Sequence, residues 1–323
     1  MPESILQEQL IVGRESFGRL TEPELAGATH FAFGVDRNFV RGMGVAIVSI
    51  LANNPERRFV FHICASSINN DDVPKLKQIV QRWATVIHIY QVDDGLLANF
   101  PTFEHLPVAI YYRIVLAHIL AEQVRQLVYL DADIVCLGNV DEILSQDFGN
   151  HVVCVVAEDH AARVEWLQLQ HERYFNSGMI FIDLEKWKKN GYSQQVLQCL
   201  EHNRDHFTLP DQDALNVVLD GKVKFLDSRW NYFYDMGHQQ EEIPADTVFL
   251  HYFGAIKPWE VICHHPMQKH YQKYERMSPW VDSPPLAPIT ASKMERYARE
   301  LWQQGEFRQA LSWYGRYAVE KFL

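Results

Sequence analysis

The 323-residue chain lacks an apolar run long enough to cross a membrane. A spanning helix needs roughly 18 or more apolar residues, whereas the best candidate, residues 106–121, is interrupted by Arg113 and His118. The opening segment MPESILQEQL also lacks the basic start and apolar core of a signal peptide. We therefore expect no transmembrane segment and a cytoplasmic location.

Cysteine and basic charge are both scarce. The five cysteines are scattered and form no CxxC pair, which argues against a disulfide framework or a zinc–thiolate site and fits a reducing compartment. Lysine and arginine number 30 against 41 acidic residues, so the formal net charge is −11. Nucleic-acid binders normally carry a basic surface, and we therefore expect no nucleic-acid partner.

Strand-like and helix-like segments alternate through the first part of the chain. Strands are predicted at 29–39, 57–65, 85–92 and from 126 onward, with helices at 40–54, 69–84 and 107–124. This alternation predicts an α/β domain with a mainly parallel sheet. Ligands bind beyond the carboxyl ends of strands in such sheets, which is where Asp36, Asp131 and Asp133 fall.

The pattern of predicted strands and helices changes in the later part of the chain. Strands are predicted at 151–158, 178–184 and 246–254, and a short helix at 211–221. Residues 279–288, PWVDSPPLAP, are too rich in proline to form a helix. Residues 290–323 then show the periodicity of two amphipathic helices.

The pair Asp131 and Asp133, separated by Ala132, is the sharpest candidate site. Hard oxygen ligands at a strand end suit Mg²⁺ or Mn²⁺, although one carboxylate could equally cap the next turn while the other is solvated. His251, at the end of another apolar run, is a candidate third ligand or an ordinary structural histidine. Nearby, Lys257 could stabilise a departing phosphate, and Gly254 would permit close backbone approach to a ligand.

Three further groups are candidates for substrate contacts. Asn176 and Ser177 could bind hydroxyls or make a turn. Asp211, Gln212 and Asp213 could hold a polyhydroxyl substrate or cap a helix. Arg113 lies in an otherwise apolar helix, and such a charge usually has a buried anionic partner.

Six segments in this order resemble the family 8 retaining glycosyltransferases, which have a GT-A fold. They are GVDRNF, YYR, LVYLDADIV, FNSGMIFIDLEKW, PDQDALN and HYFGAIKPW, and they cover residues 29 to 260. Within the family, the segments resemble those of the bacterial lipopolysaccharide core hexosyltransferases. The resemblance implies a Rossmann-like GT-A catalytic domain at 29–260, an N-terminal extension at 1–28, a Pro-rich acceptor-side linker at 261–289 and a small helical appendage at 290–323.

The resemblance also implies roles for single residues. Asp131, Asp133 and His251 would bind one Mn²⁺ or Mg²⁺ that bridges the UDP diphosphate, and Gln212 would lie near the anomeric carbon. Donor contacts would come from a larger set: Gly34, Val35, Asp36, Asn38, Phe39, Arg113, Ala132, Asn176, Ser177, Asp211, Gly254 and Lys257. Within that set, Asp36 and Asn38 would recognise uracil, Phe39 would stack on the base, and Gly254 and Lys257 would contact phosphate.

The function implied is transfer of glucose or galactose from a UDP-sugar to lipopolysaccharide core in α linkage. Alternatives are the same transfer onto another glycan, or a sugar-nucleotide-binding protein without turnover. Front-side displacement is favoured over a double displacement through Asp211 or Asp213, because the amide of Gln212 is neutral. The tail at 290–323 carries six basic and four acidic residues beside several aromatic ones. It is predicted either to lie on an anionic membrane, the cytoplasmic face of the inner membrane, or to pack on the catalytic domain.

Overall fold

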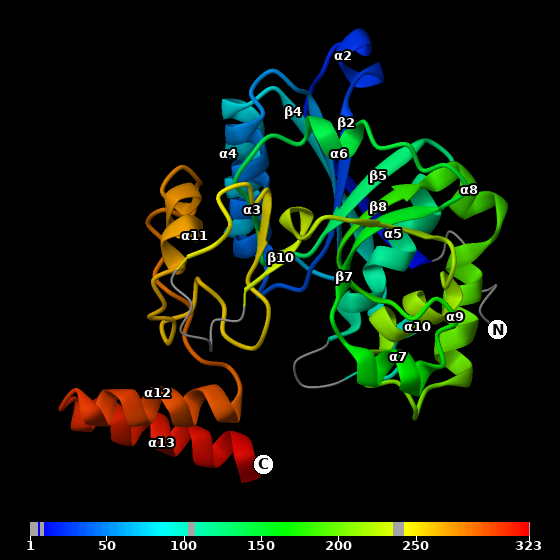
Figure 1. The fold of residues 1–323 in the computed structure, drawn as a ribbon. Coiled ribbons are helices and arrows are strands. Elements are labelled where there is room, and N and C mark those ends of the chain that lie inside the picture. The colour runs from blue at the N-terminus through cyan, green and yellow to red at the C-terminus, as the bar shows by residue number, and fades with distance from the viewer. Residues whose placement is uncertain (1–5, 7–9, 103–106, 235–241, 323) are drawn as a thin grey trace.

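A mixed eight-stranded sheet forms the centre of the protein (Figure 1). The computed structural model describes residues 6, 10–102, 107–234 and 242–322. The strand order in the sheet is β1–β4–β3–β2–β5–β8–β7–β9. The strands are β1 Ile11–Gly18, β2 Thr29–Gly34, β3 Phe59–Ala65, β4 Thr85–Val92, β5 Gln126–Leu130, β7 Val153–Glu158, β8 Tyr174–Asp183 and β9 Val223–Leu226.

The strands β4, β3, β2 and β5 run parallel, as the alternating pattern predicted. β7 and β9 are also parallel, whereas β8 is antiparallel to both of its neighbours. β1 lies in the segment assigned to an N-terminal extension, and it pairs antiparallel with β4. That segment therefore supplies an edge strand of the central sheet.

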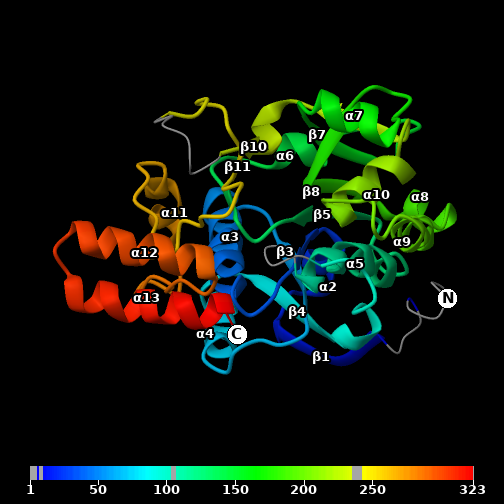
Figure 2. The ribbon, with the colours of Figure 1, turned by 90° about the horizontal axis from the view of Figure 1, so that it is seen from below.

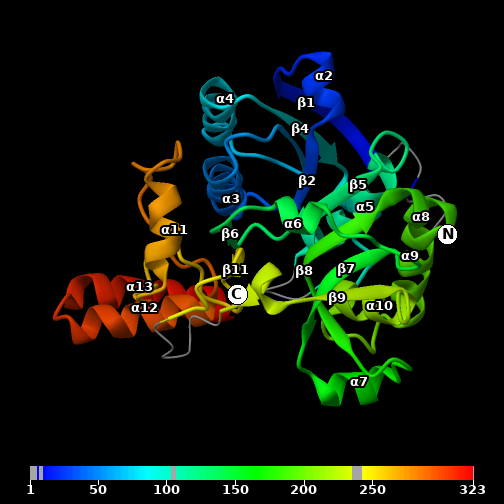
Figure 3. The ribbon, with the colours of Figure 1, turned by 45° about the horizontal axis from the view of Figure 1, so that its top comes forward.

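Helices cover both faces of the sheet (Figures 2 and 3). On one face lie α3 Val40–Asn53 and α4 Asp72–Arg82, whose apolar side chains share a core cluster with β2 and β3. The other face is covered by α5 Tyr112–Leu120, α8 Leu184–Lys189, α9 Tyr192–His202 and α10 Pro210–Val218. The strands between these layers are mostly apolar, as expected of strands buried on both faces.

α3 is buried on every side because a second layer covers its outer face. Its glycines permit close contact with that layer. A Cβ at Gly42 would lie 2.5 Å from the ring of Trp259, and one at Gly44 would lie 2.1 Å from the ring of Trp280. Trp280 belongs to the Pro-rich segment, which forms no helix, as predicted, but packs firmly against α3.

A small sheet beside the central one brings distant parts of the chain together. It consists of β10 Tyr232–Phe233, β11 Phe249–His251 and β6 Ile134–Cys136. β11 pairs antiparallel with β6, so that His251 lies opposite Ile134. The backbone N–H of Tyr252 donates to the carbonyl of Asp133 at 2.9 Å. This pairing positions the end of β11 at the turn that follows β5.

The remaining elements are short or peripheral. They are α2 Glu22–Ala26, α6 Asp141–Leu144, α7 Ala161–Leu167, α11 Gln268–Glu275, α12 Ala291–Gln303, α13 Phe307–Phe322 and the 3₁₀ turns η2 Asp94–Leu96, η3 Val108–Tyr111 and η4 Ser228–Trp230. α12 and α13 are the two predicted amphipathic helices, and they form a hairpin that lies to one side of the domain next to α11 (Figures 1 and 3). None of the described helices is long and apolar enough to cross a bilayer.

Three histidines on adjacent strands form a stacked row. The ring centroids of His30 and His62 are 5.3 Å apart, and those of His62 and His88 are 5.4 Å apart. Nδ1 of His30 is 3.0 Å from Nε2 of His62. Burial lowers the pKa of all three imidazoles, and that of His30 falls to about 4.

We predict that this row makes the fold sensitive to acid. In the unfolded chain these histidines protonate near pH 6.5, whereas in the folded protein His30 stays neutral down to about 4. The unfolded state thus binds more protons in this window, so the free energy of unfolding falls as the pH drops from about 6.5 to about 4. Urea denaturation across that range should show a shallower pH dependence for His62→Gln than for wild type. The exposed control His202→Gln should leave the slope unchanged, and equal slopes in all three proteins would contradict the prediction.

Candidate active site

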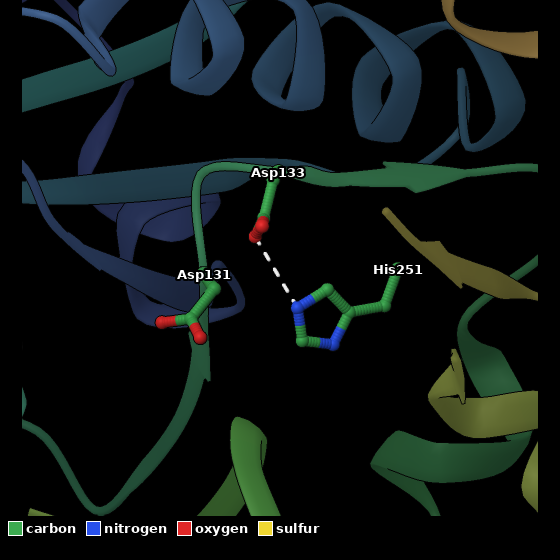
Figure 4. A group of neighbouring side chains, drawn as sticks. All are labelled: Asp131, Asp133 and His251. Atoms are coloured by element: carbon green, nitrogen blue, oxygen red, sulfur yellow. Dashed lines mark ion pairs between the residues drawn. The ribbon is translucent and has the colours of Figure 1, made fainter. Parts of the chain in front are cut away.

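The two aspartates lie in the turn between β5 and β6. β5 ends at Leu130, and the N–H of Asp131 donates to the carbonyl of Gly178 in β8 at 2.7 Å. Ala132 is buried, and its carbonyl lies against Gly42 of α3. The strand does not continue through the aspartates, so their placement comes from this turn. The carboxylate of Asp133 points toward the imidazole of His251, and Asp131 lies beside them (Figure 4).

His251 completes a group that could hold a metal ion. One candidate ligand atom from each of Asp131, Asp133 and His251 lies within 4.8 Å of the others. Nε2 of His251 is 3.3 Å from Oδ1 of Asp133 (Figure 4). Two carboxylates and one imidazole suit Mn²⁺ or Mg²⁺. The sequence predicted this grouping, and the β6–β11 pairing confirms that the three residues meet.

Asp133 has a lowered pKa although it is only 7% exposed. Burial alone would raise the pKa of its carboxyl group, but Lys257 and His251 outweigh that effect and lower the pKa below its ordinary value. The ammonium of Lys257 forms an ion pair with Asp133 and also donates to the carbonyl of Tyr252. The basic group predicted for phosphate is therefore adjacent to the candidate metal ligands.

Arg113 has the buried anionic partners that its position in an apolar helix predicted. Its guanidinium lies 2.9 Å from Asp131 and 3.1 Å from Asp211, and it also donates to the carbonyl of Ser177. Burial opposes its charge, yet the neighbouring carboxylates raise the pKa of Arg113. For Asp211 burial is the stronger effect, and its pKa is raised despite Arg113.

A network of amides lies beside these charges. The strand that was expected to start at 178 begins at Tyr174, so Asn176 and Ser177 are strand residues and not a turn. The carbonyl oxygen of Gln212 accepts from the N–H of Ser177 at 2.9 Å. The Gln212 amide nitrogen donates to Glu158 at 3.1 Å, and Asn176 donates to the same carboxylate oxygen at 3.2 Å.

Glu158 and Asn231 belong to this network and were missed by sequence analysis. Glu158 ends the apolar run HVVCVVAE, which is the same signal that singled out Asp36 and Asp131. Asn231 follows Trp230 in a short turn and carries no comparable signal. Its side chain bonds to both Asn176 and His251.

The end of β2 forms the other side of the site. Oδ1 of Asp36 accepts from the backbone N–H groups of Asn38 at 2.7 Å and Phe39 at 3.2 Å, and burial raises the pKa of Asp36. The Phe39 ring contacts Trp259 edge-on at 5.5 Å, and the Lys257 ammonium lies 5.9 Å from the Phe39 ring centre. This contact links the predicted base-stacking residue to the predicted phosphate residue.

Three residues with small or buried side chains shape the same region. A Cβ at Gly34 would lie 2.8 Å from Cβ of Tyr112, so glycine lets β2 approach α5 closely. Val35 is buried and donates its N–H to the carbonyl of Cys64 at 2.9 Å. Gly254 has a φ of +93°, a conformation that side-chain-bearing residues rarely adopt.

Comparison with known proteins identifies the family. The model of the glycosyl transferase family 8 matches residues 30–263, and that of the family 8 C-terminal region matches residues 265–321. The chain belongs to glycosyl transferase family 8. It is 28% identical to the lipopolysaccharide 1,3-galactosyltransferase of Salmonella typhimurium over 311 residues, 91% of each chain. It is 31% identical to a lipopolysaccharide 1,2-glucosyltransferase of Escherichia coli over 282 residues, 83% of each chain.

A solved structure supports the GT-A fold of this family 8 enzyme. The galactosyltransferase LgtC, crystallised with donor and acceptor sugar analogs, superposes with a TM-score of 0.67 at 20% identity. The match covers 78% of this chain and 96% of LgtC. The predicted fold class is thereby confirmed.

The carboxylate of Asp213 in this glycosyltransferase is bound by other groups of the protein. It is fully buried, pairs with Arg163 and accepts from the hydroxyl of Tyr174 at 2.7 Å. Its other oxygen accepts from the N–H groups of Thr208 and Leu209 at the start of α10. Both oxygens are therefore engaged, which fits the capping alternative and not a free nucleophile.

We predict that the Arg163–Asp213 pair contributes to stability and not to chemistry. Arg163→Leu removes one charged partner of a buried carboxylate and should lower the free energy of unfolding by about 2 to 3 kcal/mol. Urea denaturation measures the loss, and the exposed Arg204→Leu serves as control. A variant as stable as wild type, or a folded variant with no glycosyl transfer at all, would contradict the assignment.

Proposed function

We propose that this family 8 enzyme is a metal-dependent, retaining hexosyltransferase. It moves glucose or galactose from a UDP-sugar to a lipopolysaccharide core oligosaccharide in α linkage. The observation that carries the proposal is the convergence of Asp131, Asp133 and His251 at one point, with Arg113 and Lys257 beside them. The names of relatives that align over 83 to 91% of both chains favour the lipopolysaccharide acceptor.

The charged residues suit the handling of a nucleotide diphosphate. A divalent ion held by Asp131, Asp133 and His251 would supply Lewis-acid stabilisation of the diphosphate. Lys257 adds a positive charge from the side of Phe39, where the uridine is proposed to bind. Gly254 leaves room for close approach of a phosphate to the backbone.

A second group of residues suits the handling of the sugar. Arg113, Asn176 and Asp211 are proposed to contact donor hydroxyls, and Gln212 to lie by the anomeric carbon. The oxygen of Gln212 already accepts from Ser177, and its nitrogen donates to Glu158 and Tyr174. Such an amide positions groups well but is a poor nucleophile. We therefore favour attack by an acceptor hydroxyl from the face that UDP leaves, with retention of the α configuration.

A donor and acceptor screen tests the proposal. UDP-glucose, UDP-galactose and UDP-N-acetylglucosamine would each be incubated with Mn²⁺ and a series of truncated lipopolysaccharide cores, and the linkage of any product determined by NMR. An α-linked hexose on a core acceptor is the expected outcome. Transfer only to another glycan would show that the proposed lipopolysaccharide acceptor is wrong. Tight binding of the donor without any UDP release would favour the non-catalytic alternative.

We predict that the aspartates are essential for transfer but not for folding. Asp131→Asn and Asp133→Asn retain the shape and part of the hydrogen bonding but remove the ligand charge, so the transfer rate should fall at least about 100-fold. EDTA should abolish the transfer activity of the wild-type enzyme, and added Mn²⁺ should restore that activity. Asp141→Asn, on the surface, is the matched control. Full activity of the wild-type enzyme in EDTA, or active Asp131→Asn and Asp133→Asn variants, would contradict the assignment of these residues as metal ligands.

The C-terminal hairpin offers a surface for a lipid-linked acceptor. Its aromatic side chains pack partly within the hairpin, with Tyr297 against Trp313 and Trp302 against Phe307. It is joined to the domain through the ion pair of Lys293 with Glu260. A row of apolar side chains along α13 nevertheless stays exposed: Phe307, Leu311, Val319 and Phe322 are 52, 61, 56 and 77% exposed. With the basic residues of α12 and α13, this row is suited to the headgroup layer of an anionic leaflet.

We predict that this row binds membranes. Phe307→Glu combined with Leu311→Glu should abolish sedimentation with anionic liposomes, because apolar contact is lost and negative charge is added. The melting temperature and the hydrolysis of UDP-sugar in solution should not change, since both side chains are exposed. Val12→Glu, also exposed but on β1, is the control. Unchanged liposome binding, or unfolding of the double variant, would show that the hairpin is a packing element.

A further inference from the structure

The ring of His251 has two nitrogens in different surroundings. Nε2 faces Asp133 and belongs to the candidate metal group, whereas Nδ1 is 3.1 Å from Oδ1 of Asn231. A neutral imidazole carries its proton on only one nitrogen, and only the other nitrogen can bind a metal. The tautomer of His251 therefore decides whether Nε2 can act as a ligand.

A backbone N–H determines that tautomer through two side-chain amides. The N–H of Gly178 can only donate, and it lies 2.8 Å from Oδ1 of Asn176, so this atom must be the carbonyl oxygen. The Asn231 atom 3.0 Å from the same oxygen must then be the NH₂ nitrogen. The carbonyl of Asn231 consequently faces His251, and Nδ1 must carry the proton that it accepts.

The surroundings hold these groups in place. Asn231 is fully buried, and Asn176 and His251 are only 5 and 4% exposed, so bulk water offers no alternative partners. The NH₂ group of Asn176 donates to Glu158 at 3.2 Å. Gly178 also provides space, because a Cβ there would lie 2.5 Å from Cε1 of His251.

We infer that Asn231 is a positioning residue that fixes the Nδ1–H tautomer of His251 and so presents the lone pair of Nε2 to the metal site. Asn231 touches neither donor nor metal ligand position itself and acts only through His251. Residues that hold a histidine ligand in this way typically change metal affinity about 10- to 100-fold when they are replaced. The inference rests on the metal site of the proposed function.

The tautomer can be measured directly in the metal-free wild-type protein at a pH high enough for His251 to be neutral, because the imidazolium carries a proton on both nitrogens. Long-range ¹H–¹⁵N correlation spectra of ¹⁵N-histidine-labelled protein distinguish the two neutral tautomers, and His251→Gln assigns the signals. The proton is expected on Nδ1 of His251. A proton on Nε2 would overturn the inference. Because the measurement does not depend on turnover, it tests the inferred tautomer separately from the proposed transfer reaction.

Variants of Asn231 test the effect on metal binding. Mn²⁺ affinity, measured by electron paramagnetic resonance of the free ion, should fall about 10- to 100-fold in Asn231→Leu, which cannot accept from Nδ1. Asn231→Asp retains an acceptor and should recover most of the affinity. Asn54→Leu removes another buried amide, one bonded to the N–H of Val140, and should leave the affinity unchanged. Affinity within about twofold of wild type in Asn231→Leu, or an equal fall in Asn54→Leu, would contradict the positioning role.

Discussion

The negative charge of Asp131 and Asp133 is the constraint around which the site is built. Two carboxylates at the end of one strand repel each other, and removing them from water without compensation would cost several kcal/mol. Arg113 pairs with the first and Lys257 with the second. Because each carboxylate has its own cation on a different side, their oxygens can remain close to one another and to His251.

The groups around this charged centre are mostly neutral amides. Gln212, Asn176 and Asn231 each accept with one end and donate with the other. An amide can therefore extend a buried network without adding net charge, provided that every donor meets an acceptor. Glu158 ends the network as an acceptor for two of these amides. The direction of the hydrogen bonds follows from the backbone N–H groups of Ser177 and Gly178, which can only donate.

Much of the fold could be predicted from local patterns. The parallel strands and the helices between them were found because a buried strand or an amphipathic helix leaves its own period in the sequence. β1 was missed as a sheet strand because IVGRESFG, at the edge of the sheet, is largely exposed. The start of β8 was placed too late because Asn176 and Ser177 suggest a turn in isolation. In the structure they lie in β8 at an irregularity of its pairing with β7, and their side chains are satisfied by Asp211, Gln212 and Glu158.

The sequence by itself determined that Asp36, Asp131 and Asp133 follow apolar strands, and hence that they meet at one edge of the sheet. This is a local property, since it depends only on where an apolar run ends. The tertiary structure decided that His251 reaches the aspartates, that Asp213 is a cap, and that Asn231 lies behind the histidine. The position of His251 beside the aspartates depends on the antiparallel pairing of β11 with β6, between segments more than a hundred residues apart. No periodicity encodes such a pairing, because it is set by which surfaces the folded chain can bury together.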